Sequence, residues 1–260
     1  ISVEAINTGI NDVALTGATI TLNDDITTAA DSDDTGGDGV DGAVTITGAA
    51  LIGADTKVDT SSSNGTITFS STLNGANNLD LLSGTAKVDI VGDIGVGSTG
   101  ALQTLDINAT GGSGTIEIND VGTADAAGVT GLIKLGTQST GTLTMDGTNY
   151  NFGGGFTIGP DYTMTSHPSS YVTVGDVNFL GTVQVDGTFS INSGGGDISI
   201  SGNITSTGED EIISLTDGTA GDGSGTITLG GTVSASNITL VGDSGIVLSG
   251  DITSNNTGSA

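Results

Sequence analysis

The sequence predicts an all-β fold, a β-solenoid in which the chain winds as a right-handed parallel β-helix. Three observations favour this class: apolar residues alternate with Thr and Ser, clusters of Gly, Asn and Asp separate these runs at short intervals, and aromatic residues make up only 3% of the chain. Alternation with a period of two is typical of strands with one buried face. The frequent turn residues keep those strands short.

The expected strands follow one another along the chain. A Gly followed by alternating Thr or Glu and Ile, Leu, Phe or Met recurs in several places, and similar alternation fills the stretch after residue 180. The clearest of these segments are 65–69, 114–118, 141–145, 183–185, 189–191, 198–200 and 225–229. Helical spacing is hard to find, because the best candidate, 124–135, is interrupted by Gly128 and Gly131.

A tandem array of β-sandwiches is the alternative to a solenoid. Sandwiches have longer strands and a core richer in aromatic residues, whereas this chain has 3 Tyr, 5 Phe and no Trp. In a solenoid, coils stack at about 4.8 Å and aliphatic side chains form ladders along the axis. With coils of about 20–24 residues, we expect about a dozen turns and a rod on the order of 50–60 Å long. The usual crossover preference makes it right-handed.

The chain carries a near copy of its own beginning at its end. Residues 12–27 resemble 237–253, and pairing Ile26 with Ile252 places the two copies 226 residues apart. Repeats indicate arrays, because stacked units bury faces that one unit cannot bury alone. Without a Pro-rich linker or charge block to mark a boundary, we interpret 1–260 as one continuous rod, with 150–171 as a candidate irregular insertion. The start at Ile1 without Met suggests a processed or excised chain.

The charge is strongly acidic. The chain has 30 Asp and Glu residues, three Lys and no Arg, which gives a net charge of −27. Most of the acids are Asp, which favours turns, and such a surface repels phosphate backbones and anionic lipids. We therefore expect neither nucleic acid binding nor membrane insertion, and no stretch is apolar enough for a spanning helix. The absence of Cys suits export through a bacterial envelope.

Several segments of the sequence resemble segments of a known class of proteins. They are GTITFSSTLNGANNLDLLSGTAKVDIVGDIG (65–95), DISISGNITS (197–206) and GTITLGGTVSASNITLVGDSG (225–245). They are similar to giant bacterial surface proteins of the filamentous-haemagglutinin-like, β-strand-repeat type. The resemblance implies a right-handed β-helical shaft, export to the cell surface, and a role in adhesion or in an extracellular fibre.

One acidic, Gly-rich segment has the composition of a calcium site. Residues 36–41 match the start of the G-G-x-G-x-D nonamer of calcium-binding β-rolls, and calcium takes six to eight oxygen ligands. A single nonamer lacks the consecutive copies that complete such a site, so a solvated loop is the alternative. A second acidic turn lies at 217–223. The candidate calcium ligands are Asp31, Asp33, Asp34, Asp38 and Asp41.

Catalysis is not expected. Lys57, Lys87 and Lys134 fall in separate repeats, so the chain has no cationic cluster for an acidic sugar. Acids adjacent in sequence, such as Asp24 and Asp25, point to opposite faces of a strand. His167 has no second His or Cys with which to bind a transition metal. A β-helical enzyme acting on polysaccharide is only a minor alternative.

Five of the eight aromatic residues gather between 150 and 171. Packing inside the coil is the favoured interpretation, and a patch of Tyr150, Phe152 and Tyr162 that stacks on a sugar is the alternative.

The sequence as a whole leads to two alternative hypotheses of function. The chain is a structural unit of an extracellular fibre or cell-surface shaft, joined head-to-tail to other copies or to covalent neighbours. Alternatively, it is an adhesin segment that binds a carbohydrate or a cell-surface protein.

Overall fold

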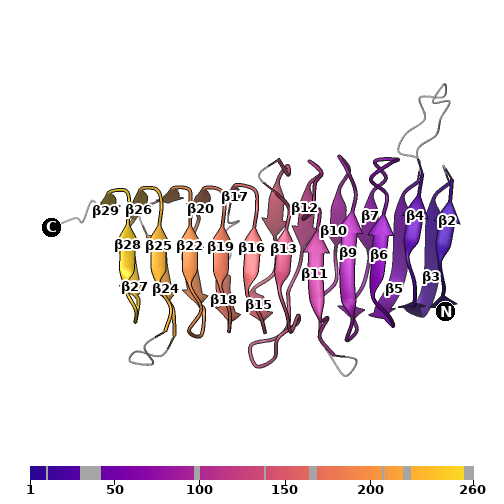
Figure 1. Ribbon diagram of the computed structural model, residues 1–260, viewed down its shortest axis with the longest axis horizontal. Coiled ribbons are helices and arrows are strands. Elements are labelled where there is room, and N and C mark those ends of the chain that lie inside the picture. The colour runs from indigo at the N-terminus through magenta and orange to yellow at the C-terminus, as the bar shows by residue number, and fades with distance from the viewer. Residues whose placement is uncertain are drawn as a thin grey trace.

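The protein is a straight rod of stacked β-coils (Figure 1). The computed structural model describes residues 1–9, 11–29, 42–96, 100–137, 139–163, 169–206, 208, 210–218 and 224–254. Over these ranges every regular element is a β-strand and every paired strand runs parallel to its neighbour; one isolated bridge, between Thr123 and Ala126, is antiparallel. The all-β solenoid is therefore confirmed, and the sandwich alternative is wrong, because sandwiches are built from antiparallel sheets.

Three sheets run along the rod. The front sheet in Figure 1 has eleven strands. In spatial order they are β2 (Ile6–Thr8), β4 (Ile26–Thr28), β6 (Thr56–Asp59), β9 (Asn78–Leu82), β11 (Thr104–Ile107), β13 (Ile133–Leu135), β16 (Phe156–Ile158), β19 (Val177–Phe179), β22 (Ile198–Ile200), β25 (Ile227–Leu229) and β28 (Ile246–Leu248).

The back sheet has thirteen strands and the lower sheet has five. The back strands are β1 (Ser2–Val3), β3 (Val13–Leu22), β5 (Val44–Ile52), β7 (Ile67–Phe69), β8 (Leu73–Asn74), β10 (Val88–Ile90), β12 (Ile116–Ile118), β14 (Leu143–Met145), β17 (Tyr162–Thr163), β20 (Val183–Val185), β23 (Ile204–Ser206), β26 (Val233–Ala235) and β29 (Ile252–Ser254). The lower strands are β15 (Asn149–Phe152), β18 (Ser169–Thr173), β21 (Thr188–Asn192), β24 (Ile212–Thr216) and β27 (Asn237–Val241).

The core consists of three ladders of inward-facing side chains, one behind each face. Each ladder residue is paired in register with the equivalent residue of the next coil, and those inside the stack are buried. The front ladder is Ile6, Ile26, Val58, Leu81, Ile107, Leu135, Ile158, Phe179, Ile200, Leu229 and Leu248. The back ladder is Val13, Val44, Ile67, Val88, Ile116, Leu143, Tyr162, Val183, Ile204, Val233 and Ile252. The lower ladder is Ile20, Ala50, Leu73, Ile94, Val121, Tyr150, Tyr171, Ile191, Leu215 and Leu240.

The eleven front strands give about ten turns, fewer than the dozen expected. The number of residues per coil varies more than assumed: the step along the front ladder ranges from 19 residues, between Leu229 and Leu248, to 32 residues, between Ile26 and Val58. At about 4.8 Å per coil, ten turns span about 48 Å. In Figure 1 the front strands run upward while successive coils shift from the N-terminus on the right towards the left, so the coil is right-handed.

Two details expected from the sequence look different in the fold. The described part of 150–171 is regular, because β15, β16 and β17 pair in register with their neighbours. Segment 124–135, in contrast, contains no helix, as its interruption by glycines predicts, and it ends in strand β13. The similar segments 12–27 and 237–253 occupy different faces, since Ile26 lies in the front ladder and Ile252 in the back ladder. The likeness is therefore offset by one face of the coil.

Glycine is required where the backbone of one coil touches that of the next. Gly48 has φ +129°, and a Cβ there would collide with the carbonyl oxygen of Gly17 in the preceding coil. An L-residue would meet both strain and a clash at such a position. Close approach of successive turns accounts for part of the high glycine content of the chain.

We expect the inward ladders to carry the stability of the rod. Replacing Ile158, which is fully buried in the front ladder, with Ala should lower the free energy of unfolding by about 2–5 kcal/mol, because it leaves a cavity between coils. The neighbouring Thr157 faces outward, so Thr157→Ala should change it by less than about 0.5 kcal/mol. Urea unfolding followed by circular dichroism measures both. Equal effects of the two variants would contradict the ladder assignment.

Candidate functional site

The structure does not describe the predicted calcium ligands. The segment 30–41 lies outside the described residues, and it contains all five of them: Asp31, Asp33, Asp34, Asp38 and Asp41. His167 also lies outside the described residues, in 164–168. Calcium binding by that loop therefore stays a prediction. Among the described residues, no group of three or more His, Cys, Asp or Glu side chains is arranged to hold a metal ion.

The second acidic turn begins with a buried carboxylate. Asp217 has no exposed surface, and its Oδ2 accepts a hydrogen bond from the backbone N–H of Asp243 at 2.8 Å. Its Oδ1 has no hydrogen-bond partner in the part of the chain that the structure describes. The described portion of this turn thus uses its first acid to hold the following coil.

The aromatic residues are in the core, which corrects the proposed sugar-stacking patch. The side chains of Tyr150, Phe152 and Tyr162 are each 1% exposed. The other five aromatic side chains of the chain are equally buried: Phe69, Phe156, Tyr171, Phe179 and Phe189. No aromatic ring is therefore available on the surface for stacking against a ligand, because each one fills the interior of a coil.

Seven of these rings form one cluster inside three successive coils. Tyr150 and Tyr171 stack with their ring centroids 5.1 Å apart, and Phe156 meets Phe179 edge to face at 5.5 Å. The phenol oxygens are paired as well, since Tyr171 donates a hydrogen bond to the Oη of Tyr162 at 2.8 Å. Burial raises the pKa of the Tyr150 phenol far above its ordinary value. Packing, the interpretation favoured from sequence, is what the cluster does.

Many of the acids have a structural task. An Asp just before a strand accepts a hydrogen bond from a backbone N–H of the next coil, so that its carboxylate ties two coils together. Asp161 does this for Thr182 at 2.7 Å, and Asp176 does it for Asp197 at 3.0 Å. The same contact joins Asp12 to Ala43, Asp25 to Lys57, Asp55 to Asn78, Asp120 to Asn149 and Asp197 to Thr226. The acidic composition therefore reflects, in part, the number of coil junctions.

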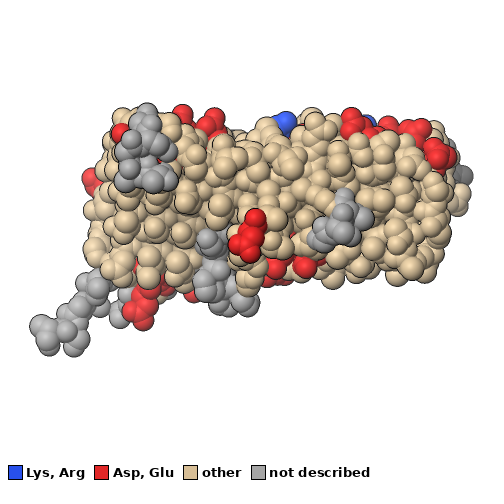
Figure 2. Space-filling view, turned by 90° about the horizontal axis from the view of Figure 1, so that it is seen from below, with Lys and Arg blue, Asp and Glu red and all other residues tan. Residues whose placement is uncertain are grey.

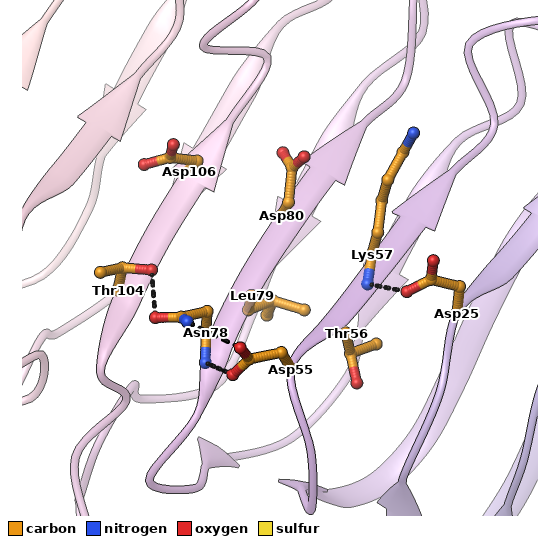
Figure 3. A pocket seen from close by; sticks show the side chains of 9 residues that line it. All are labelled: Asp25, Asp55, Thr56, Lys57, Asn78, Leu79, Asp80, Thr104 and Asp106. Carbon is orange, nitrogen blue, oxygen red and sulfur yellow. Dashed lines mark hydrogen bonds between the residues drawn. The ribbon is translucent and has the colours of Figure 1, made fainter.

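A charged hollow on the front sheet is the strongest candidate site (Figure 3). Its volume is about 310 Å³, and it spans β4 to β11 on the outer face. Asp55 accepts hydrogen bonds from both the backbone and the side-chain amide of Asn78, whose Oδ1 accepts one from Thr104 at 2.8 Å. The lining residues are Asp25, Asp55, Thr56, Lys57, Asn78, Leu79, Asp80, Thr104 and Asp106.

Charges of both signs line up along this face. One outward-facing ladder of register partners contains, in successive coils, Lys57, Asp80, Asp106 and Lys134. Parallel in-register pairing points all four side chains the same way, about 4.8 Å apart along the axis. Lys134 forms an ion pair with Asp106 at 3.2 Å. The two acids in the middle are thus flanked by a lysine on either side.

All three lysines of the chain lie where acids stack. Lys57 pairs with Asp59 at 2.8 Å, and their hydrogen bond raises the pKa of Lys57. On the back sheet Lys87 contacts both Asp89 and Glu117, which are register partners. Burial disfavours the charge of Lys87, but its hydrogen bonds to these two acids outweigh burial and raise its pKa. Each lysine offsets repulsion that coil stacking imposes on the acids.

Within this ladder, Asp80 is an acid whose ionised form is disfavoured by its surroundings. Partial burial, and then the charge of Asp106 one coil further on, raise the pKa of its carboxyl above the ordinary 3.8. The several carboxylates that line the hollow can accept hydrogen bonds from hydroxyl or amine donors.

Sequence reasoning missed the pair of Asp80 and Asp106 because it looked for acids adjacent in sequence. The available signal was an Asp at the centre of two similar strands, 79–81 and 105–107.

No family model matches the chain, and no curated protein or solved structure matches it. A search of the described residues for a helix that is long and apolar enough to cross a membrane finds none.

The coil-joining carboxylates can be tested at Asp120. Its side chain accepts hydrogen bonds from the backbone N–H groups of Thr148 and Asn149. Asp120→Ala should lower the free energy of unfolding by about 1–3 kcal/mol, because an exposed backbone N–H (Thr148) and a half-buried one (Asn149) lose a charged hydrogen-bond acceptor. Asp120→Asn, which keeps one acceptor oxygen, should restore part of the loss. Asp125 is exposed, and Asp125→Ala serves as the control. An effect at Asp125 as large as that at Asp120 would contradict the assignment.

The raised pKa of Asp80 gives a pH dependence with a defined sign. In the folded chain ionisation is less favourable than in the unfolded chain, so Asp80 costs stability as pH rises through the range just above 3.8. Asp80→Asn should therefore raise the melting temperature at pH 7 by about 1–3 °C. At pH 3, where Asp80 is protonated in both states, the gain should disappear. A gain that is independent of pH would show that charge is not its cause.

Proposed function

We propose that the chain is a non-catalytic structural unit of an extracellular fibre or cell-surface shaft. The observation that supports this most directly is the state of the last coil. Ile246, Leu248 and Ile252 continue the inward ladders but are 40%, 46% and 43% exposed. Their counterparts one coil earlier, Ile227, Leu229 and Val233, are at most 2% exposed.

Such a coil end is complementary to another coil. It presents inward-facing apolar side chains, and its strands are the last ones of their parallel sheets over the described residues. An edge strand of this kind pairs readily with a further strand. At the opposite end Ile6 and Leu15 are only partly buried. A further coil, from a longer chain or from a second copy, would cover either end and extend the rod. Head-to-tail stacking of copies generates an open filament.

An adhesin segment is the second candidate, and the resemblance to bacterial surface proteins is compatible with both. Its ligand would not meet an aromatic patch, since the rings are buried. The hollow on the front sheet offers carboxylates, amides and hydroxyls instead. An exported, surface-exposed location belongs to both proposals.

Negative-stain electron microscopy of the natively purified protein, with calcium and again with chelator, separates the two candidates. The fibre proposal expects long unbranched threads whose axial repeat is close to the roughly 48 Å of ten coils or a multiple of it. Isolated short rods under both conditions would contradict it and would favour the adhesin segment.

Head-to-tail stacking makes a sharper prediction for the last coil. Ile246→Lys combined with Leu248→Lys should abolish end-to-end association, because a charge on the inward ladder cannot be covered by an apolar coil. Val247 lies between these residues, faces outward and is 50% exposed. The control Val247→Lys should leave association unchanged in sedimentation velocity runs. If the double variant still forms threads, the ends of the coils are not the contact.

A further inference from the structure

A recurrent polar contact between successive coils consists of two hydrogen bonds to a single residue. An Asp or Asn lies directly before a strand, and its Oδ1 accepts the backbone N–H of a residue in the next coil. The N–H of the first residue of the strand donates to the carbonyl oxygen of that same residue. Asp161 and Tyr162 hold Thr182 in this way, with donor–acceptor distances of 2.7 and 2.8 Å. We call such a pair of residues a coil clamp.

Further coil clamps lie on the front and back sheets. Because a coil clamp binds backbone groups alone, the side chain of the residue that it holds is free to vary. The acceptor can be an amide instead of a carboxylate, as at Asn203. Further examples are Asp12 with Val13 (holding Ala43), Asp176 with Val177 (holding Asp197), Asp197 with Ile198 (holding Thr226) and Asn203 with Ile204 (holding Thr232).

The last described coil ends in a coil clamp that has no residue to hold. Along the back sheet, the acceptor recurs in every second coil, at Asp161, Asn203 and Asp251. Asp251 lies directly before β29, which is the last strand of this sheet over the described residues. Asp251 is exposed, and Ile252 is 43% exposed. By register, the carboxylate of Asp251 and the N–H of Ile252 are placed to hold one backbone residue of an added strand.

The first coil of the chain matches this end in one register. Among the described strands, β1 pairs with β3 only at Thr21 and Leu22, so the stretch 13–16 of β3 lies at the edge of the back sheet. Setting 13–16 of a second copy against β29 brings the backbone of its Asp12 to the coil clamp. The same step continues all three inward ladders with apolar residues, since it pairs Ile252 with Val13, Leu248 with Ile6 and Leu240 with Ile1.

We infer that Asp251 and Ile252 form a binding site for one backbone residue of an extended strand, and that Asp12 of a second copy is the residue held there. The site rests on the end-to-end stacking proposed above, to which it adds a polar contact and a defined register. The occupant follows from the coil pattern itself. The joint would repeat the contact that each coil clamp makes inside the rod, with the ladders in phase.

Two acids meet at this joint, but the rod already contains the same arrangement. Asp197 is held by the coil clamp that begins at Asp176, and it begins a coil clamp of its own. Asp12 would do the same, because it would be held by Asp251 while its carboxylate holds the next coil of its own copy. Acidic side chains lie near both ends of the rod (Figure 2). We therefore expect salt to strengthen the contact by screening the repulsion between copies.

Sedimentation velocity of the full chain at about 0.5 M salt, which screens the net charge, tests the polar contact. Asp251→Ala removes the acceptor and should weaken end-to-end association about tenfold. Asp251→Asn keeps an acceptor oxygen, as Asn203 does inside the rod, and should weaken it less than about threefold. The control Asp125→Ala removes an equal charge from an exposed turn in the middle of the rod and should change it less than about twofold. All three variants should keep the melting temperature of the unaltered chain within about 2 °C.

Disulfide trapping tests the register, because the chain has no Cys of its own. The inferred joint sets Thr253 of one copy beside Ala14 of the next. Ala14→Cys with Thr253→Cys in one chain should therefore yield series of disulfide-linked copies on oxidation, since neighbouring strands place such Cα atoms about 5 Å apart. The matched control, Thr16→Cys with Thr253→Cys, moves one thiol about 6.6 Å along the strand and should link far less.

The outcomes separate the coil clamp from the stacking on which it rests. Association that is as strong in Asp251→Ala as in Asp125→Ala would overturn the clamp and leave the apolar contact between coil ends in place. Equal linking of the two Cys pairs would overturn the register and likewise leave the stacking in place. An unaltered chain that stays monomeric up to millimolar concentration at high salt would overturn both, because no second copy would then be held.

Discussion

Parallel, in-register pairing between successive coils is the constraint on which the rest of the structure depends. It places each residue directly over its counterpart one coil earlier, about 4.8 Å away. Apolar side chains that are stacked in this way make a continuous core from coils too small to have one of their own. The same rule acts on polar positions, where it sets Asp80 against Asp106 and Asp89 against Glu117. Stacking is favourable for Ile, Leu and Val and unfavourable for like charges.

The distribution of charge follows from that rule. Acids at coil junctions are useful, since a carboxylate such as that of Asp176 accepts a backbone N–H from the next coil. Acids in the middle of strands repel their register partners, and the three lysines of the chain are found beside them. The strands from β14 onward avoid the conflict on all three faces, because none of them contains a charged residue. Charged residues within strands are thus confined to the coils up to β13.

Much of the fold could be predicted from the sequence, because alternation with a period of two and dense turn residues are local signals. The charged site could not, since the number of residues per coil varies from 19 to 32 along the front ladder. Without the coil lengths, nothing in the sequence places Asp106 beside Asp80 instead of facing another turn. The alternative of a sugar-stacking patch was wrong for a related reason. Tyr150 and Tyr162 are close in sequence, but whether a ring points inward depends on its place in a strand, and both point inward. Residues 12–27 and 237–253 resemble each other because both have the same sequence pattern of short strands and turns, although they lie on two different faces of the coil.

The seven-ring cluster has an optical consequence. The chain has no Trp, and its three Tyr all lie within this cluster in the middle of the rod. Intrinsic fluorescence therefore reports on those few coils alone, whereas circular dichroism reports on strands along the whole length. Coils that fray from either end would leave the emission unchanged while the dichroic signal falls. Comparing the two signals during denaturation would therefore locate where along the rod unfolding begins, without any added label.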